Sequence, residues 1–236
     1  MCGRFSQYRA MIDYLEALGD AVPLARGLEP EPIGRYNVAP RSKVQLLYRN
    51  ESGLCFDPVT WGYAPSWARG KKPPAINARV ETMASSRFFH TIWQRGDRAL
   101  VGADGWYEWK KDPHDAKRKQ PYFIRLKQGE PLFFAALGQF AREGGAEERE
   151  GDGFVIVTMA SAAGMAEIHD RRPLVLTPEA AREWLDHDLP AAQAEELALQ
   201  HALPVTAFEW YPVDKGVGNV RNEGAERIRP IPAPLL

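Results

Sequence analysis

The chain has 236 residues, of which 44% are hydrophobic, and this is enough apolar material for the core of one large domain. Its 30 basic and 31 acidic side chains nearly cancel, which excludes the overall positive charge typical of proteins that coat duplex DNA. We therefore expect a single domain over residues 1–236, in which any nucleic-acid site is a local patch.

The sequence gives no sign of a metal site or a membrane segment. Its two cysteines, Cys2 and Cys55, cannot form a disulfide framework or a CxxC metal site, and no second histidine or cysteine stands at ligand spacing from His169. No apolar stretch reaches the length of a membrane span, and the N-terminus lacks the order of a signal peptide. We expect a cytoplasmic monomer that uses no cofactor.

The first half of the chain begins with helical spacing of apolar residues. This spacing predicts a helix over residues 7–18, ended by Gly19. Residues 22–40 are rich in proline and glycine, which is typical of a loop. Short apolar runs at residues 43–49 and 55–63 flank a turn sequence and predict a β-hairpin.

Later elements are predicted from the same two periodicities. Strands are expected at residues 98–103, 106–110, 121–126, 131–140, 154–159, 174–177 and 207–213, and helices at residues 81–95, 178–186 and 191–201. The acidic, glycine-rich residues 141–153 are expected to form a solvated hairpin loop. Because strands and helices do not alternate regularly, the pattern favours an α+β fold with a curved or barrel-like antiparallel sheet and flanking helices.

The N-terminal motif Met1-Cys2-Gly3-Arg4-Phe5 contains a candidate reactive group. If Met1 is removed, Cys2 carries a free α-amine beside its thiol, and such a 1,2-aminothiol condenses with an aldehyde to an imine and then a thiazolidine ring. The ordinary pKa values of about 7.7–8.0 for the amine and about 8.5 for the thiol leave a minority of each nucleophilic at neutral pH. We expect Cys2 to be exposed at the start of the mature chain. The alternative is that Cys2 is only the small residue after a start codon.

The segment Pro73-Pro74-Ala75-Ile76-Asn77-Ala78-Arg79 contains a candidate amide and a candidate guanidinium. The prolines enforce an extended backbone, so Asn77 and Arg79 should share one face of a strand, about 7 Å apart. An amide can orient a reacting group and a guanidinium can bind a phosphate. The alternative is a structural asparagine beside an arginine in a surface ion pair.

Glu108 lies in Gly105-Trp106-Tyr107-Glu108-Trp109, after a predicted turn at Asp104-Gly105. Trp106 and Glu108 should face one way, and Tyr107 and Trp109 the other. A carboxylate beside a large aromatic ring loses hydration, which raises its pKa and suits it to acid/base catalysis near neutral pH. The alternative is an ordinary strand glutamate.

His169 precedes the basic pair Arg171-Arg172 and an apolar strand. A histidine near basic residues tends to stay neutral, and it could then protonate or polarise the ring oxygen of a sugar. The alternative is a structural loop histidine.

Trp67 lies among aromatic residues and is followed closely by Arg69, Lys71 and Lys72. Aromatic rings that stack bases, combined with positive charges, are typical of single-strand binding channels. The alternative is that Trp67 only packs its own loop.

Several motifs occur in a single order along nearly the whole chain. They are Met1-Cys2-Gly3-Arg4-Phe5, Tyr36-Asn37-Val38-Ala39-Pro40, Trp61-Gly62, Ile76-Asn77-Ala78-Arg79-Val80-Glu81-Thr82, Gly105-Trp106-Tyr107-Glu108-Trp109, His169-Asp170-Arg171-Arg172-Pro173 and Val217-Gly218-Asn219-Val220. Their order resembles the SOS response-associated peptidase family, SRAP, and in particular its bacterial members.

The resemblance implies a function in DNA damage. A protein of this family would shield abasic sites in single-stranded DNA, because its N-terminal cysteine forms a thiazolidine with the ring-opened deoxyribose aldehyde and protects the lesion from strand cleavage. It would act in the SOS response, at the nucleoid when DNA is damaged, and the family name adds peptidase (hydrolase) activity. The implied fold is a single α+β domain around a distorted antiparallel barrel, with a positively charged groove leading to the N-terminus.

The resemblance also assigns catalytic roles to this sequence. Cys2 would be the nucleophile and crosslinking residue, and Asn77 would position the N-terminus and the adduct. Glu108 would act as acid/base in imine formation, and His169 would assist sugar ring opening and reversal of the crosslink.

For DNA binding, the resemblance implies that Arg4, Arg79 and Arg171 hold phosphates beside the lesion and that Trp67 stacks on a base. Two positions depart from the family pattern. Ala68 stands where some bacterial members carry a second tryptophan, which weakens the expectation of base stacking. Arg172 stands where many members have methionine.

Two other functions fit the same residues. Cys2 could be the nucleophile of a thiol peptidase that attacks amides, including its own bond to Met1. The protein could also read single-stranded or modified DNA without chemistry. The sequence leaves open how Met1 is removed, whether duplex beside the lesion is required, and whether attachment is reversible.

Overall fold

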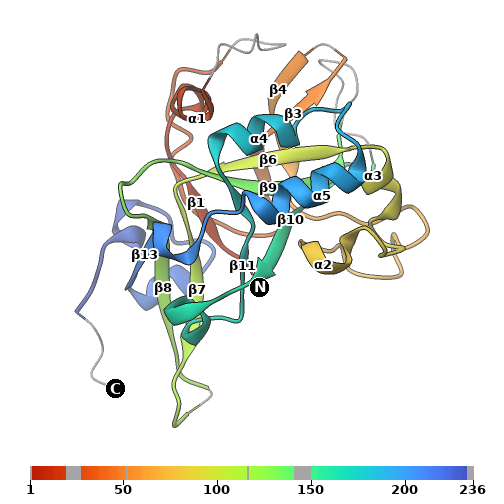
Figure 1. Cartoon of the computed structure of the whole chain (residues 1–236). Helices are drawn as coiled ribbons and strands as arrows, with labels where there is room; N and C mark the ends of the chain where they lie inside the picture. Colours follow the sequence, from red (N-terminus) through yellow and green to blue (C-terminus); the bar gives the residue numbers. More distant parts are fainter. Residues whose placement is uncertain (1, 20–27, 52, 116, 141–149, 233–236) are drawn as a thin grey trace.

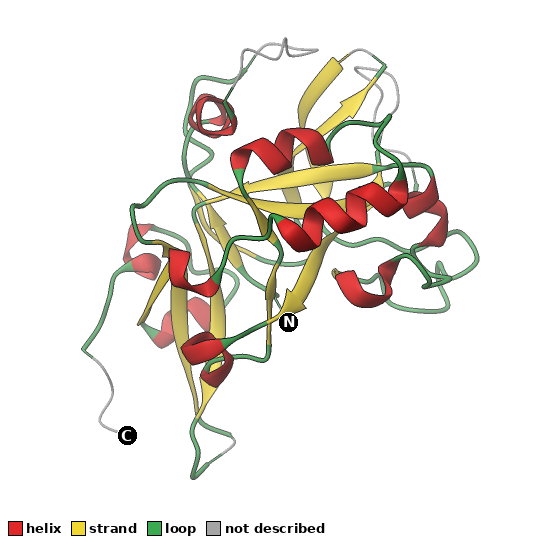
Figure 2. Ribbon diagram, viewed as in Figure 1, coloured by secondary structure: helices red, strands yellow, loops and turns green. Residues whose placement is uncertain are grey.

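Two β-sheets organise the part of the chain that the structure describes, residues 2–19, 28–51, 53–115, 117–140 and 150–232. The structure is a computed structural model. Figures 1 and 2 show the two sheets and the helices that cover the larger one. The larger sheet has the order β11 (Arg171–Pro173), β10 (Gly153–Ala160), β9 (Leu132–Gln139), β6 (Arg98–Ala103), β3 (Lys43–Asn50) and β4 (Gly53–Thr60), with β12 (Val175–Leu176) on β9 and β5 (Asn77–Arg79) on β10.

The smaller sheet carries the N-terminal strand in its interior. Its order is β13 (Phe208–Pro212), β8 (Lys119–Leu126), β7 (Gly105–Lys111), β1 (Phe5–Gln7) and β2 (Arg35–Val38). All of its pairings are antiparallel. The residues before β1, including Cys2, therefore start beside β7, the strand that contains Glu108.

The helices are short. They are α1 (Met11–Leu18), α2 (Val80–Met83), α3 (His90–Gln94), α4 (Pro178–Trp184) and α5 (Ala191–Gln200), and 3₁₀ turns occur at η1 (Ala163–Glu167), η2 (Val205–Ala207), η3 (Lys215–Gly218) and η4 (Ala225–Ile228). Within the described ranges no helix is long and apolar enough to cross a bilayer.

Strand β9 shows why two hydrophobic cores form. Its side chains alternate between two apolar surroundings, which is why its sequence is apolar without interruption. Phe133 and Leu137 pack among the residues beneath the helices, with Trp184, whereas Phe134 packs between the two sheets, with Phe5. The second core also contains Cys2.

A corner at Asp104 joins the two sheets. β6 ends at Ala103 and β7 begins at Gly105, so the predicted turn passes the chain from one sheet to the other. A Cβ atom at Gly105 would lie 2.3 Å from Cζ of Phe123, which leaves no space for a side chain. This corner places the N-terminal end of β7 next to β1.

The α+β prediction is confirmed, but the strands do not close into a barrel. The path of the larger sheet ends at β4 and β11, and that of the smaller at β2 and β13. These edge strands do not pair with one another among the described residues, although Trp61, directly after β4, forms an isolated parallel bridge with Phe154 of β10. The hairpin of residues 43–49 and 55–63 is confirmed as β3 and β4, with the second strand ending at Thr60.

Two helix predictions need correction. The predicted helix at residues 81–95 is instead α2 and α3, because Ser85 Oγ bonds the carbonyl of Thr82 and Ser86 Oγ accepts from the backbone of Phe88, and such local bonds compete with a continuous helix. The predicted helix at residues 7–18 begins only at Met11, since Gln7 pairs in β1 and Ala10 forms an isolated bridge with Pro32.

Loop predictions met different outcomes. The predicted loop at residues 22–40 contains β2, and its residues 22–27 lie outside the described residues. Most of the predicted loop at residues 141–153 also lies outside them, while Gly153 already belongs to β10.

Candidate functional site

Cys2 lies at the junction of β1, β5 and β7. Its side chain is 0% exposed and packs in the core between the sheets. Burial raises the pKa of the Cys2 thiol far above its usual value, and the negative charge of Glu108 adds to this effect. In the chain that carries Met1, the thiol is therefore neutral and shielded. The expected exposure concerns the chain without Met1 and stays a prediction.

Asn77 holds the backbone of Cys2. Its Nδ2 donates a hydrogen bond of 2.8 Å to the Cys2 carbonyl. The Oδ1 atom of Asn77 is buried and has no hydrogen-bond partner among the described residues. An unsatisfied buried acceptor is costly, so this atom marks a place where a donor group would bind well.

Strand β5 positions Asn77 by pairing in parallel with β10, where Asn77 lies opposite Ile156. Ala78 is buried, Asn77 is half-buried and Arg79 is exposed. This alternation fits the prediction that Asn77 and Arg79 share one face. Arg79 forms no ion pair with any residue in the described ranges.

Glu108 is a buried carboxylate on β7. Only 3% of it is exposed, and Trp106 on the same face packs in the core between the sheets, whereas Tyr107 packs in a separate cluster. The predicted alternation is confirmed. Burial raises the pKa of Glu108 to about 7, so its carboxyl group exchanges protons near neutral pH.

His169 faces Glu108 from the segment after η1. Its Nε2 lies 4.0 Å from Oε2 of Glu108. Burial lowers the pKa of His169, as the neutral form requires. Nδ1 accepts a 3.0 Å hydrogen bond from the backbone of Arg171, although the exposed Asp170 carboxylate also lies 3.0 Å from it. A backbone N–H always donates, so we assign the proton of the neutral ring to Nε2, which points at Glu108.

Arg171 lies beside β10, the strand that also positions Asn77, because β11 pairs with β10. Its Nη1 and Nη2 form a forked ion pair with Glu81 at 2.7 and 2.9 Å, and Nη2 also donates to the Thr158 carbonyl at 2.8 Å. A phosphate at this guanidinium would have to compete with Glu81. Sequence reasoning missed Glu81 and Thr158, because their roles depend on which strands pair.

Arg4 is buried and its bonds are internal. Nη1 donates to Asn37 Oδ1 and to the Val217 carbonyl, both at 2.8 Å, and the guanidinium lies 5.8 Å from the ring centre of Trp109. Asn37 Nδ2 donates to the carbonyls of the same C-terminal segment, at Val217, Asn219 and Asn222. Arg4 thus fastens this segment next to the N-terminus.

Trp67 is 39% exposed and lies between positive charges. Lys72 Nζ is 5.7 Å and Arg87 Cζ is 5.0 Å from its ring centre, and Phe88 contacts the ring edge on. A ring flanked by cations can stack a base while the cations bind phosphates. Arg87 was missed because it fell inside the helix predicted over residues 81–95. Ala68 is buried in the loop, where its carbonyl accepts from Lys71 and Lys72.

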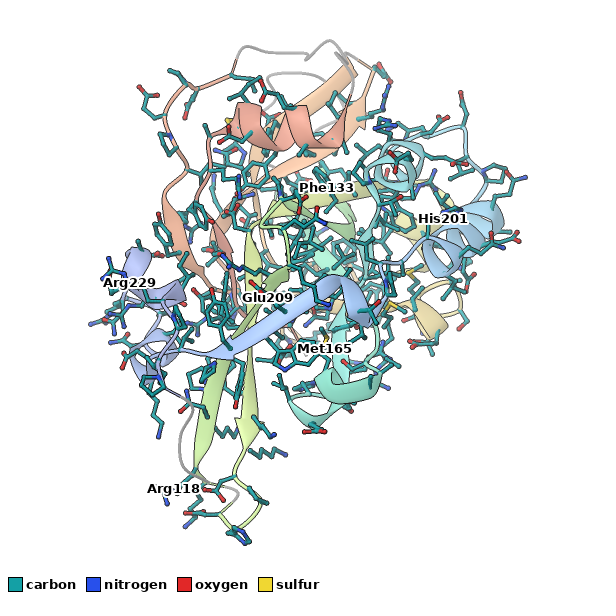
Figure 3. The ribbon with its side chains drawn as sticks, turned by 60° about the vertical axis from the view of Figure 1, so that its left-hand side comes forward. Arg118, Phe133, Met165, His201, Glu209 and Arg229 are labelled. Atoms are coloured by element: carbon teal, nitrogen blue, oxygen red, sulfur yellow. The ribbon has the colours of Figure 1, made fainter. Side chains whose placement is uncertain are left out.

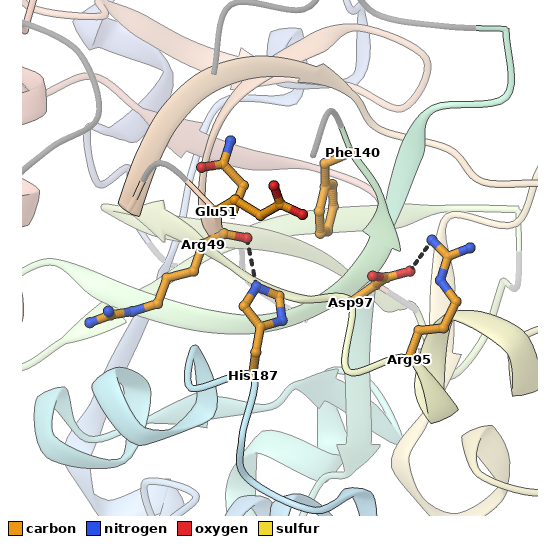
Figure 4. A pocket seen from close by; sticks show the side chains of 7 residues that line it. Arg49, Glu51, Arg95, Asp97, Phe140 and His187 are labelled. Atoms are coloured by element: carbon orange, nitrogen blue, oxygen red, sulfur yellow. Dashed lines mark hydrogen bonds and ion pairs between the residues drawn. The ribbon is translucent and has the colours of Figure 1, made fainter. Parts of the chain in front are cut away.

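The described residues contain no candidate metal cluster, and a separate pocket lies away from this arrangement. No group of three or more potential metal ligands occurs among the residues that the structure describes. Figure 4 shows a pocket of about 300 Å³ between the β3–β4 turn and residues 95–97, where His187 Nε2 lies 2.7 Å from the Arg49 carbonyl and Arg95 pairs with Asp97. None of the predicted site residues lines this pocket.

Comparisons with known proteins agree over the length of the chain. A family model described as "SOS response associated peptidase (SRAP)" matches residues 1–220. The chain is 51% identical to "Abasic site processing protein YedK" of Escherichia coli, over 98% of this chain and 100% of that protein. It is 30% identical to "Abasic site processing protein YoaM" of Bacillus subtilis, over 97% of each chain. A solved structure of a phage-related protein from Bordetella bronchiseptica matches with a TM-score of 0.75 and 40% identity, over 91% of this chain and 95% of that chain.

Proposed function

The chain belongs to the SOS response-associated peptidase (SRAP) family, and we propose that it processes abasic sites in single-stranded DNA by forming a covalent thiazolidine through Cys2. Full-length similarity to proteins named for abasic site processing supports the substrate. The observation that carries the chemistry is the convergence of Asn77 and Glu108 on Cys2. We further propose that the protein works as a cytoplasmic monomer and reaches the nucleoid when DNA is damaged.

The reaction begins with the loss of Met1, which exposes the α-amine of Cys2. This amine adds to the aldehyde carbon of the ring-opened deoxyribose, and loss of one water gives an imine. The thiol sulfur then adds to the imine carbon, and its proton moves to the nitrogen, which closes the thiazolidine. The product is the sum of protein and DNA minus one water.

The surrounding side chains suit each proton movement. Glu108, with a pKa of about 7, can protonate the departing hydroxyl group and later accept a proton. The orphaned Oδ1 of Asn77 can accept a hydrogen bond from the α-amine or the adduct, while Nδ2 fixes the carbonyl of Cys2. The Nε2–H of His169 can donate to the sugar ring oxygen as the ring opens.

DNA binding would use the exposed cations around this centre. Arg79 is available for a phosphate, and Arg171 could exchange Glu81 for one. Trp67 would stack on a base between Lys72 and Arg87. Arg4 would contribute its charge, but its internal bonds support a positioning role more than direct phosphate contact.

The test is to incubate processed protein with a single-stranded oligonucleotide that contains one abasic site. We expect a species that survives denaturing electrophoresis and whose intact mass equals protein plus DNA minus one water. Cys2→Ala should abolish it, and Cys55→Ala should not, because Cys55 is buried inside β4 and has no free α-amine to form the imine. Absence of the species with protein that lacks Met1 would rule the proposal out.

The same experiment separates the alternative functions. A thiol peptidase would turn over peptide substrates in a Cys2-dependent manner. A non-covalent reader would bind the oligonucleotide equally well with Cys2→Ala and leave no stable product. The intact mass of the free protein reports whether Met1 is removed, and its removal in purified protein but not in Cys2→Ala would support self-cleavage.

A further inference from the structure

The hairpin of β7 and β8 extends past the body of the protein as an arm. Figures 1 and 2 show the end of this hairpin projecting beyond the other strands of both sheets. Figure 3 places Arg118 near its tip, far from Phe133 in the core. We define the basic arm as residues 110–115 and 117–120. The basic residues of the arm are Lys110, Lys111, Lys117, Arg118 and Lys119, and its acidic residues are Asp112 and Asp115.

The arm has a local positive charge that the chain as a whole lacks. Its charged residues sum to a net positive value, whereas the whole chain has a net charge of −1. Both carboxylates are used within the turn, where Asp112 accepts from the backbone of His114 at 2.8 Å and Asp115 from that of Lys117 at 3.0 Å. The two carboxylates therefore stabilise the turn through hydrogen bonds to its backbone.

Most of these cations lack an ion-pair partner. Lys110 pairs with Glu167 at 3.5 Å. Among the residues that the structure describes, Lys111, Lys117, Arg118 and Lys119 form no salt bridge, and all of them are exposed. Lys111 lies directly opposite Lys119 in the register of β7 and β8. Like charges in directly opposed positions destabilise a sheet, so the fold carries a cost that a polyanion would relieve.

The arm is continuous with the candidate site. Lys111 is on the same strand as Glu108, about 10 Å further along at the usual rise per residue. The positive charge of Lys111 is among the causes that lower the pKa of His169, although burial contributes more. Figure 1 shows β11, which carries Arg171, between the arm and α2. A strand bound at Cys2 that leaves past β7 would therefore run along the arm.

We propose that the basic arm binds the phosphate backbone of the DNA strand that flanks the abasic site, beyond the phosphates next to the lesion. This inference rests on the proposed function. Flexible lysine and arginine side chains on both strands of a hairpin can follow a phosphate backbone without reading its sequence. The arm thus extends the binding site, and it makes affinity depend on the length of the flanking strand.

The test measures non-covalent binding of the full chain to DNA that contains a tetrahydrofuran abasic analogue, which has no aldehyde. Two ligands are compared, a trinucleotide with the lesion at its centre and a long single strand, and a third ligand carries duplex on one side. The variant is Lys117→Gln/Arg118→Gln/Lys119→Gln. One control, Lys117→Arg/Lys119→Arg, keeps the charge, and another, Lys127→Gln, removes a lysine just beyond the opposite end of β8.

We expect the variant to lose about tenfold in affinity for the long strand, with a log–log salt dependence shallower by about 2, the slope expected for three single-strand phosphate contacts. Affinity for the trinucleotide should stay within about twofold of wild type, because these contacts lie outside it. Both controls should bind as wild type does. The duplex ligand shows whether the flanking backbone is recognised single-stranded or paired. The unfolding midpoint should be unchanged or raised, since a like-charge pair is removed.

The proposal is overturned if wild-type protein binds both ligands equally, or if the variant keeps wild-type affinity and salt dependence on the long strand. Loss of binding to anionic vesicles with unchanged DNA affinity would assign the arm to membranes instead. Because the analogue cannot crosslink, these outcomes are independent of Cys2. Failure of the proposed function would appear separately, as absence of a covalent product with the natural abasic site.

Discussion

Glu108 is the side chain on which the proposed proton transfers depend. Its carboxyl group is buried next to Trp106, and its pKa is raised to about 7. Below this pH it is protonated and can donate to the departing hydroxyl group. Above it, the carboxylate cannot donate, while the α-amine of Cys2 becomes a better nucleophile as it loses its own proton at a pKa of about 7.7–8.0.

The pH–rate profile of crosslinking should therefore be bell-shaped. The limb that falls with rising pH belongs to Glu108, and in Glu108→Gln it should disappear, with a loss of about 100-fold in rate at pH values below 7. Single-turnover rates from quenched samples across a pH series measure this. Glu167→Gln, which removes an exposed carboxylate, should keep the wild-type profile. A bell that survives in Glu108→Gln would show that another group supplies the proton.

Asn77 should affect the rate more than binding. Asn77→Ala removes the 2.8 Å hydrogen bond to the Cys2 carbonyl and the orphaned Oδ1 acceptor. We expect crosslinking to slow by about 10- to 1,000-fold, as for loss of one positioned donor. Asn77→Asp keeps the shape but turns a carboxylate toward a carbonyl oxygen, so it should be at least as slow.

Affinity for the tetrahydrofuran analogue separates the two effects of Asn77. It should change by less than about threefold in Asn77→Ala, because the phosphate-binding cations remain. A parallel loss of affinity and rate would make Asn77 a structural residue.

Some of these residues could be predicted from sequence alone. Side chains two residues apart on a strand lie on the same face, and this was enough to place Asn77 with Arg79 and Glu108 with Trp106. The burial of Cys2 and the pairing of Arg171 with Glu81 could not be predicted, because they depend on which strands lie beside β10. The family resemblance named the residues, but it did not reveal that Arg4 bonds to Val217.

At the scale of elements, strand β11 carries an arginine on each face, and the two differ in their surroundings. Arg171 has an ion pair, whereas Arg172 is 4% exposed, lies above the ring of Phe208 and, within the described ranges, bonds only through Nη2 to the Leu203 carbonyl at 2.7 Å. Its Nε and Nη1 are buried without partners among the described residues, and burial lowers its pKa to about 10. A buried guanidinium without an acid is costly.

Replacing Arg172 should therefore stabilise the protein. For Arg172→Met we expect a gain of about 1–3 kcal/mol in the free energy of unfolding, since methionine fits an apolar site and leaves no donor unpaired. Urea unfolding at constant m-value measures this. Crosslinking should stay at the wild-type level, because the contacts of Arg172 are with the Leu203 carbonyl and the Phe208 ring and include neither Cys2 nor Glu108.

Arg98 is the matched control. It is equally buried, but its Nε and Nη2 donate to the carbonyls of Trp184, the last residue of α4, and of Asp186 and Leu189 just after it. Arg98→Met should destabilise by about 2–4 kcal/mol, because these carbonyls lose their partner. Equal effects of the two substitutions would contradict the assignment.

Elements were predictable where their pattern was local. The β3–β4 hairpin follows from two apolar runs and a turn, and the start of α4 follows from Thr177, whose side chain accepts from the backbone of Ala180. β1 and β11 each have three residues and derive their stability from partners far along the chain, so local patterns did not reveal them. The barrel-like sheet was expected from the strand pattern as well as from the resemblance, but the edge strands do not pair with one another among the described residues, so the sheets stay open.

At the scale of the whole molecule, the corner at Asp104 ties the sheets together. The Asp104 carboxylate accepts from Tyr14 Oη at 2.6 Å, from the backbone of Tyr8 at 2.7 Å and from Arg9 Nε at 2.7 Å. These donors belong to α1 and to the segment after β1. One buried carboxylate thus fixes the helix, the corner and the smaller sheet, and we propose that the chain unfolds as a single domain.

The prediction for Asp104→Ala follows from this shared anchor. Removing the carboxylate leaves buried donors unpaired and should lower the free energy of unfolding by about 3 kcal/mol. If the two sheets unfold as one cooperative unit, the opening free energy of the most protected amides should fall by that same amount in both β8 and β9. Native-state hydrogen exchange followed by mass spectrometry measures this. Ser6→Ala, which removes only a 3.5 Å contact with the Gly105 carbonyl at the same corner, should change both strands little. If β8 lost protection while β9 did not, the two sheets would unfold independently. The corner at Asp104 would then stabilise only the smaller sheet.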